Sequence, residues 1–217
     1  MKRLEDQEIF EIELLEWMKN KGFLQRLIFG GGTMLRLCHE LNRFSIDLDF
    51  WSYRLKNPES YYEELNLTLS KKYDITDTAN KFNTILLEIR RPQKTGRLKI
   101  EIRKNQDEWD FEERIAFSTF SNRQVFLRVF TLEQMMKNKI AALIQRKEIR
   151  DAFDLEFILK KGLKLTADKK DTKKIQDIIA GFTIRDYKVT LGSLIEKSQR
   201  GYYTGNNFSF LLEKIIE

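Results

Sequence analysis

The chain has 217 residues, of which 41% are hydrophobic and 33% charged, and this balance excludes an intrinsically disordered or collagen-like protein. Its length allows one domain or two small ones. One cysteine, Cys38, and one histidine, His39, exclude an internal disulfide framework, a cysteine-based zinc site and a multi-histidine metal site. Any acid–base or metal chemistry therefore has to depend on carboxylates.

The formal net charge of +6 is distributed unevenly along the chain. Residues 1–130 contain 22 basic and 21 acidic side chains, whereas residues 131–217 contain 17 basic and 12 acidic ones, a net charge of +5. Residues 81–104 hold a second basic excess, with eight Lys or Arg against two Glu. Both stretches suit a polyanionic partner, although lysines solvated on helix surfaces explain them as well.

The sequence gives no sign of a membrane segment. No stretch approaches eighteen consecutive apolar residues, and residues 1–6 lack the apolar core of a secretory signal. Together with a free cysteine, these features predict a cytoplasmic protein without a membrane partner.

Residues 1–130 alternate between helical and extended patterns. The segment 105–123, rich in charged and aromatic residues, matches neither pattern. The expected elements, in chain order, are a helix over 5–20, a strand over 24–29, a helix over 33–41, a strand over 45–51, a helix from Pro58 to about residue 71, strands over 74–79, 83–91 and 97–104, and a short strand over 125–130.

From Thr131 onward the pattern is helical almost throughout, with breaks expected near Gly162, Gly181 and Gly201. We therefore expect an α/β core at 1–130, followed by a helical region at 131–217 that packs on it.

Two aspartates mark the strand expected over 45–51. Asp47 and Asp49 are two residues apart, so their carboxylates project from one face, with Cα atoms about 6.6 Å apart. Carboxylates at this spacing can share a hard divalent cation such as magnesium, although the same pattern also describes the solvated face of an edge strand.

A glycine turn lies upstream of these aspartates. In Gly30-Gly31-Gly32-Thr33, between the expected strand and helix, the backbone can approach a phosphate closely and its N–H groups favour negative charge. The alternative is a merely flexible turn. A glycine turn that leads through a helix into an Asp-x-Asp strand favours a phosphate and metal site.

These segments, GGTMLRL at 31–37 and RFSIDLDF at 43–50, resemble the first signature of the AbiEii/AbiGii toxin family, part of the nucleotidyltransferase superfamily. The resemblance implies an α+β fold, with a nucleotidyltransferase-like mixed sheet flanked by helices and followed by a helical C-terminal half. It also implies a two-ion site in which Asp47, Asp49 and a third carboxylate hold magnesium. Glu101, on the polar face of the strand over 97–104, is the first candidate for that carboxylate and Glu88 the second. An ordinary ion pair with Lys99 or Arg103 is the other explanation for Glu101.

A second similarity lies in KIAAL at 139–143, Arg146 and RDAFDL at 150–155, which resemble the family's second signature. On one continuous helix Lys139, Arg146 and Arg150 would lie within about 20° of a common stripe that could hold nucleotide phosphates. The alternative is a charged outer helix face supported by an Arg150–Asp154 pair. The resemblance implies that Lys139 contacts the phosphates, that Asp151 and Asp154 orient groups or transfer protons, and that the nucleotide-binding residues are Gly31, Gly32, Thr33, Ser45, Lys139, Arg146 and Arg150.

The function implied by the resemblance is transfer of a nucleoside monophosphate from an NTP to RNA, with the 3′ end of tRNA as the expected acceptor. The protein would be the toxin of a toxin–antitoxin or phage-defence pair, with a cognate antitoxin as a further partner. Two alternatives stay open: a non-catalytic nucleotide-binding regulator that acts through a protein partner, and a nucleotidyltransferase that modifies a protein hydroxyl.

Overall fold

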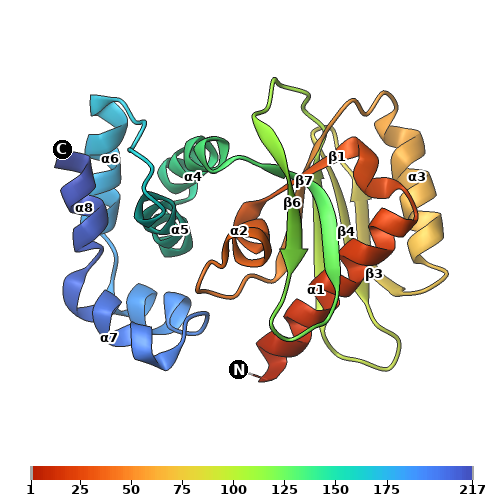
Figure 1. Ribbon diagram of the computed structural model, residues 1–217, viewed down its shortest axis with the longest axis horizontal. Helices are drawn as coiled ribbons and strands as arrows, with labels where there is room; N and C mark the ends of the chain where they lie inside the picture. Colours follow the sequence, from red (N-terminus) through yellow and green to blue (C-terminus); the bar gives the residue numbers. More distant parts are fainter. Residues whose placement is uncertain (1, 217) are drawn as a thin grey trace. The chain divides into compact units, whose positions relative to one another are not determined.

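The computed structural model describes residues 2–216, and the chain forms two compact units. The first unit comprises Met1–Glu40 and Phe44–Phe130, and the second comprises Leu41–Arg43 and Thr131–Glu217. The first contains a seven-stranded sheet, and the second is built from helices (Figure 1).

The expected helices and strands of the first unit form within a few residues of their predicted bounds. Gly22, at φ 81°, follows α1, and Asn57 caps α3 by accepting a hydrogen bond from the Ser60 N–H beside Pro58. The elements are α1 (Lys2–Asn20), the 3₁₀ turn η1 (Phe23–Arg26), β1 (Leu27–Gly30), α2 (Gly31–His39), β2 (Asp47–Ser52), α3 (Pro58–Leu69), β3 (Asp74–Asn80), β4 (Thr84–Arg90), β5 (Arg97–Arg103), β6 (Phe111–Phe117) and β7 (Gln124–Phe130).

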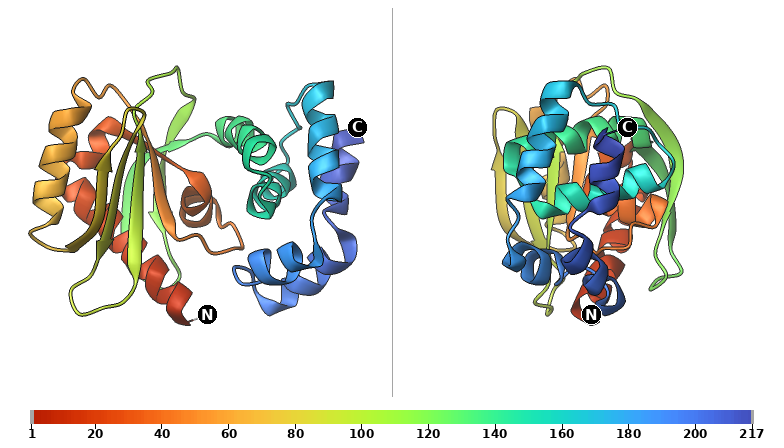
Figure 2. Two further views of the ribbon diagram at one scale, coloured as in Figure 1. Left: turned by 180° about the vertical axis from the view of Figure 1, so that it is seen from behind. Right: turned by 90° about the vertical axis from the view of Figure 1, so that its left-hand side faces the viewer.

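The sheet has the strand order β3-β4-β5-β2-β1-β7-β6. The pairs β2–β5 and β1–β7 are parallel and the others antiparallel, so the expected mixed sheet is confirmed. Two opposite views place α1 and α3 on one side of this sheet and α2 on the other (Figures 1 and 2).

Alternation along β5 gives this strand one apolar side and one polar side. Leu98, Ile100 and Ile102 are fully buried, whereas Lys99 and Glu101 are partly exposed. On β2, Leu48 and Phe50 are buried in the same way. A strand over the expected range 45–51 would place Ile46 on the same buried side, but Ile46 is 42% exposed because β2 begins only at Asp47.

Strand β6 lies inside the segment whose sequence matched no pattern. Its side chains Phe111, Ile115 and Phe117 are 36%, 49% and 37% exposed, so its large apolar residues do not mark a buried face. β6 pairs along its length with β7 at the edge of the sheet.

In the second unit the helices end near two of the three predicted glycines. Gly162 and Gly181 follow helices as expected, but Gly201 lies inside a helix that continues to a left-handed Asn207, so the third predicted break is wrong. The elements are α4 (Leu132–Arg146), α5 (Ile149–Lys160), α6 (Lys169–Ala180), the π-helical η2 (Asp186–Leu191), α7 (Lys197–Asn206) and α8 (Ser209–Ile216).

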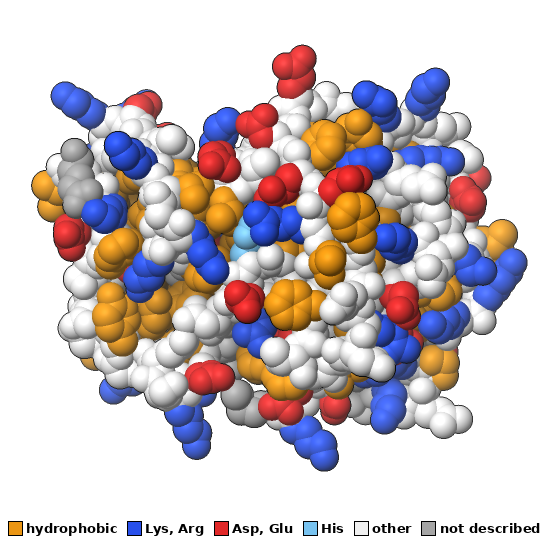
Figure 3. Space-filling view, viewed as in Figure 1, with side chains coloured by type: hydrophobic (Ala, Val, Ile, Leu, Met, Phe, Trp, Pro, Cys, Tyr) orange, Lys and Arg blue, Asp and Glu red, His pale blue; other side chains and the backbone are white. Residues whose placement is uncertain are grey.

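Charged side chains of both signs cover the surface shown in Figure 3, where Lys and Arg are interspersed with Asp and Glu. The basic residues therefore do not form one continuous patch on that face. Within residues 2–216, none of the helices combines the length and apolarity needed to cross a bilayer.

Candidate functional site

The two aspartates of β2 lie on the side of the strand opposite its core residues Leu48 and Phe50. Leu48 and Phe50 point into the core, and Asp47 and Asp49, which alternate with them, are half-buried on the other side. Strand alternation thus puts both carboxylates on one face, as their spacing predicts.

The glycine turn makes room for Asp49. A Cβ atom at Gly31 would lie 2.2 Å from Oδ2 of Asp49, and Gly31 has a φ of 74°, in the left-handed region that favours glycine. Gly30 is the cross-strand partner of Asp49. The Asp49 carboxylate therefore lies beside the first turn of α2, where the helix dipole is positive.

Thr33 holds the start of β2 against α2. Its side chain is fully buried, and its hydroxyl donates a 2.5 Å hydrogen bond to the backbone carbonyl of Asp47. The sequence led us to expect this hydroxyl at a phosphate, but in the structure it is used within the protein. Gly32 is buried in the same helical turn, and Ser45 is half-buried two residues before β2.

Strand register separates the two candidates for the third carboxylate. Glu101 is the direct neighbour of Asp49 in the parallel β2–β5 pair, whereas Glu88 lies on β4, one strand and about 4.8 Å further away. Register therefore favours Glu101.

The carboxylate of Glu101 already has two cationic partners. Nζ of Lys99 lies 2.9 Å from one of its oxygens, and Nη2 of Arg103 lies 3.4 Å from the other. These are the ion pairs that the sequence offered as the alternative explanation for Glu101. Glu88 pairs with Arg97 at 3.0 Å, and a hydrogen bond from Thr76, together with Arg97, lowers its pKa.

The magnesium site implied by the resemblance requires carboxylate oxygens that can converge on one ion. Asp47 and Asp49 offer the hard oxygen ligands that magnesium prefers, from one strand face and beside a helix N-terminus. Among residues 2–216, no three His, Cys, Asp or Glu side chains gather into a group that could hold a metal ion. Two of the three proposed ligands, Asp47 and Asp49, thus suit magnesium, while the carboxylate of the third, Glu101, is paired with Lys99 and Arg103.

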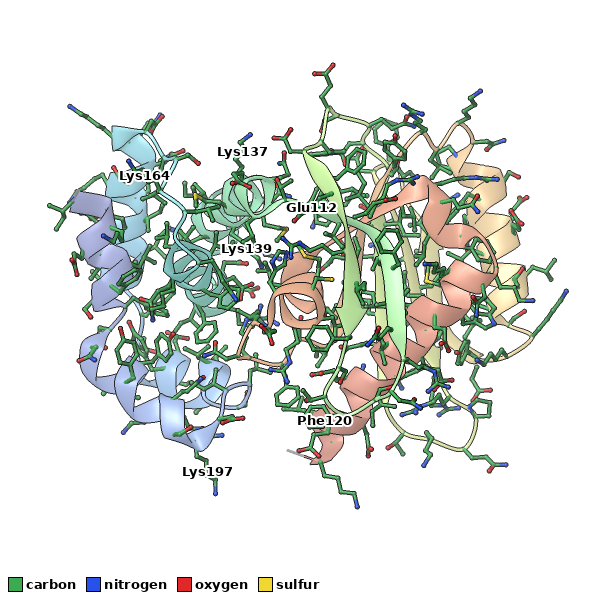
Figure 4. The ribbon with its side chains drawn as sticks, viewed as in Figure 1. Glu112, Phe120, Lys137, Lys139, Lys164 and Lys197 are labelled. Atoms are coloured by element: carbon green, nitrogen blue, oxygen red, sulfur yellow. The ribbon has the colours of Figure 1, made fainter. Side chains whose placement is uncertain are left out.

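A buried charged cluster lies in the second unit. Asp154 has no exposed surface, and it accepts hydrogen bonds from Nε and Nη2 of Arg43 at 2.6 and 2.7 Å. Lys139, labelled in Figure 4, reaches Asp154 at 2.6 Å and Asp151 at 3.0 Å. Arg146 completes the cluster with a 2.9 Å ion pair to Asp151.

The residues of the second signature lie on two helices and not on one continuous helix. Lys147 adopts a left-handed conformation, with φ 54°, which ends α4 before α5 begins at Ile149. The stripe of three cations, which required one continuous helix, therefore does not form. The side chain of Lys139 is 8% exposed at the centre of the cluster, and Arg150 pairs with Glu148 at 2.6 Å instead of with Asp154.

Electrostatics keep Asp154 and Lys139 ionised. Burial favours the neutral form of Asp154, but the positive charges of Arg43 and Lys139 outweigh it and lower the pKa of Asp154. Burial likewise favours neutral Lys139, and Asp154 and Asp151 outweigh it and raise the pKa of Lys139. Both groups are therefore charged at neutral pH.

Sequence reasoning matched Arg43 to the first signature but assigned it no role. Its partner Asp154 is 111 residues away, and no local pattern links the two positions. The one feature of the sequence that could have linked them is that Arg43 belongs to the first signature and Asp154 to the second.

Comparisons with known proteins agree with these features. The family model described as "Nucleotidyl transferase AbiEii toxin, Type IV TA system" matches residues 13–205. The crystal structure of JHP933 from Helicobacter pylori is similar, with a TM-score of 0.58, 19% identity and coverage of 95% of this chain and 93% of that one. The crystal structure of a "putative nucleotidyltransferase from H. pylori" has a TM-score of 0.57 and 19% identity, and the match covers 95% of this chain and 96% of that one. The search of curated proteins finds no significant match.

Proposed function

Because the chain belongs to the AbiEii nucleotidyltransferase toxin family, we propose that it transfers a nucleoside monophosphate from an NTP to RNA, with the 3′ end of tRNA as the acceptor. The family match confirms the resemblance found in the two signatures, and the similar structures share the nucleotidyltransferase-like α+β fold. The observation that carries the proposal is the position of Asp49 against Gly31, with Asp47 on the same strand face.

In the proposed reaction the acceptor hydroxyl oxygen forms a bond to the α-phosphorus of the NTP. The bond between that phosphorus and the bridging oxygen to the β-phosphate breaks, pyrophosphate leaves, and the hydroxyl proton passes to solvent or a nearby base. Asp47 and Asp49, with Glu101 as third member, would hold magnesium. Bound magnesium would activate the hydroxyl and neutralise charge on the triphosphate.

The start of α2 is the proposed phosphate cradle. The backbone N–H groups of Gly31 and Gly32 lie in the first turn, where the helix dipole favours anions. Thr33 acts there by fixing Asp47 through its hydroxyl, and Ser45 stays a proposed nucleotide contact.

The cations of the second unit divide by exposure. The side chains of Arg146 and Arg150 are 46% and 38% exposed, so we assign phosphate contacts to them. Lys139 is buried between Asp151 and Asp154, and we assign it a positioning role in which it fixes Asp151, the partner of Arg146. A direct phosphate contact by Lys139 would require it to give up one of these carboxylates.

The charge of residues 131–217 supports a polyanionic acceptor. Their net charge of +5 favours RNA over a protein hydroxyl as the group that receives the nucleotide. The Type IV toxin–antitoxin description of the family adds a cognate antitoxin to the proposed partners.

Incubation of the protein with magnesium, total tRNA and each α-labelled NTP in turn tests the proposal. We expect labelled RNA with at least one nucleotide, and at least a roughly 100-fold loss in Asp49→Asn, because a metal-binding carboxylate is replaced by a neutral amide. The matched control is Asp77→Asn, the same change at an exposed position of β3.

Three other outcomes of this assay would contradict the proposal or favour one of its alternatives. Absence of labelled RNA with all four nucleotides would contradict RNA transfer. Label that stays on polypeptide after RNase treatment would identify a protein hydroxyl as the acceptor. Nucleotide binding without any covalent product would favour a regulator.

A further inference from the structure

Lys99 lies among the three carboxylates of the proposed metal site. It is the cross-strand neighbour of Asp47, just as Glu101 is the neighbour of Asp49. Paired positions on parallel strands face the same side of a sheet, so all four side chains share the polar face. The ammonium of Lys99 reaches Glu101 at 2.9 Å.

The charge of Lys99 is coupled to the whole group. Its ammonium pairs with Glu101 at 2.9 Å, and the strand register places Lys99 next to Asp47. The ammonium thus interacts with the carboxylates that a divalent cation would need.

We infer that Lys99 is a resident counter-ion of this site: its ammonium neutralises the carboxylates while no metal is bound, and a divalent cation must displace it to recruit Glu101. The inference rests on the proposed function, because it takes Asp47, Asp49 and Glu101 as the metal ligands. It makes Lys99 a positioning residue that sets metal affinity through Glu101.

The side-chain geometry allows such an exchange. The Lys99 side chain is 42% exposed and flexible, so it can leave Glu101 for solvent or for a phosphate oxygen of the bound nucleotide. Arg103 makes a longer contact with Glu101, at 3.4 Å, and its guanidinium also lies over the ring of Trp51, 5.0 Å from the centroid. Arg103 is therefore the less mobile partner of Glu101, and Lys99 is the one that exchanges.

The test measures Mn²⁺ binding to the full chain without nucleotide, by titration calorimetry and by electron paramagnetic resonance. We expect Lys99→Met to bind Mn²⁺ about tenfold more tightly than the unmodified protein, because one competing positive charge is removed a few ångströms from the ligands. Lys99→Arg, which keeps the charge, should stay within about threefold of the unmodified protein.

The matched control is Arg97→Met, two residues earlier on the same face of β5. Arg97 pairs with Glu88, which is not one of the proposed ligands. Its removal should leave Mn²⁺ affinity unchanged. A second readout is thermal unfolding: Lys99→Met should unfold at a lower temperature in EDTA and gain more from added Mg²⁺ than the unmodified protein does.

Two results would overturn the inference: unchanged Mn²⁺ affinity in Lys99→Met, or an equal increase in Arg97→Met. A protein that binds no Mn²⁺ in any form would also overturn it. The proposed function fails separately, because a missing RNA product combined with the expected Mn²⁺ affinities would reject the reaction and keep the role of Lys99.

Discussion

The charged cluster of the second unit makes a quantitative prediction for Asp154→Asn. In the folded protein this carboxylate accepts two hydrogen bonds from Arg43 and one ion pair from Lys139, all at 2.6 to 2.7 Å and without exposure to solvent. The variant removes the negative charge that pairs with both Arg43 and Lys139. Removing one partner of a buried ion pair typically costs about 3–5 kcal/mol, and we expect a loss in this range.

Urea unfolding at pH 7, followed by far-UV circular dichroism, measures this free energy. The control is Glu148→Gln, which breaks the ion pair to Arg150 between side chains that are 39% and 38% exposed, and it should cost at most about 1 kcal/mol. A loss below about 1 kcal/mol in Asp154→Asn, or one equal to the control, would refute the reasoning.

The same variant should change the response to acid. The pKa of Asp154 is lowered on folding, so its contribution to stability is complete above its unfolded pKa of about 3.9 and is lost as pH falls through the lower folded pKa. In Asp154→Asn this component is missing. Its urea midpoint should therefore depend less on pH below about pH 4 than that of the unmodified protein.

Three further predictions concern the first unit. Gly31→Ala should lower the free energy of unfolding by about 1–2 kcal/mol because of the φ of 74°, and it should reduce nucleotide transfer at least about tenfold because the added Cβ displaces Asp49. Its control is Gly22→Ala, which has a φ of 81° but no atom within 4 Å of the added Cβ, and which should keep nucleotide transfer. Glu11 is buried, and burial together with neighbouring carboxylates raises its pKa well above the usual value. The contribution of Glu11 to folding stability is complete below about pH 4.3 and is lost as pH rises through the folded pKa. At pH 7, Glu11→Gln should therefore unfold at a higher urea concentration than the unmodified protein. Burial raises the pKa of Cys38 to about 12, so its thiol should react with a disulfide reagent in urea but not in the folded state.

Local periodicity explains which parts of the sheet were predictable. A period of two puts Asp47 and Asp49 on one face whatever the rest of the chain does, and the same alternation defines β5. β6 was not predictable in this way, because Phe111 and Ile115 are exposed and its apolar residues carry no information about a core.

Long-range pairing explains what the sequence could not provide. The break between α4 and α5 depends on a left-handed Lys147, and lysine has no preference for that conformation that a reader of the sequence could use. The choice between Glu101 and Glu88 needed the strand order, since both residues lie on polar strand faces and only register shows which one is next to Asp49.

The two signatures therefore combine residues with different physical roles. Asp47 and Asp49 belong to the first unit and face the proposed reaction, whereas Arg43, from the same signature, binds Asp154 of the second signature inside the second unit. Arg43 offers a planar, bidentate pair of donors, which a lysine cannot reproduce. Loss of activity on changing Arg43 would thus follow from instability of the second unit, and activity measurements on signature variants have to be paired with unfolding measurements before a residue is assigned to the chemistry.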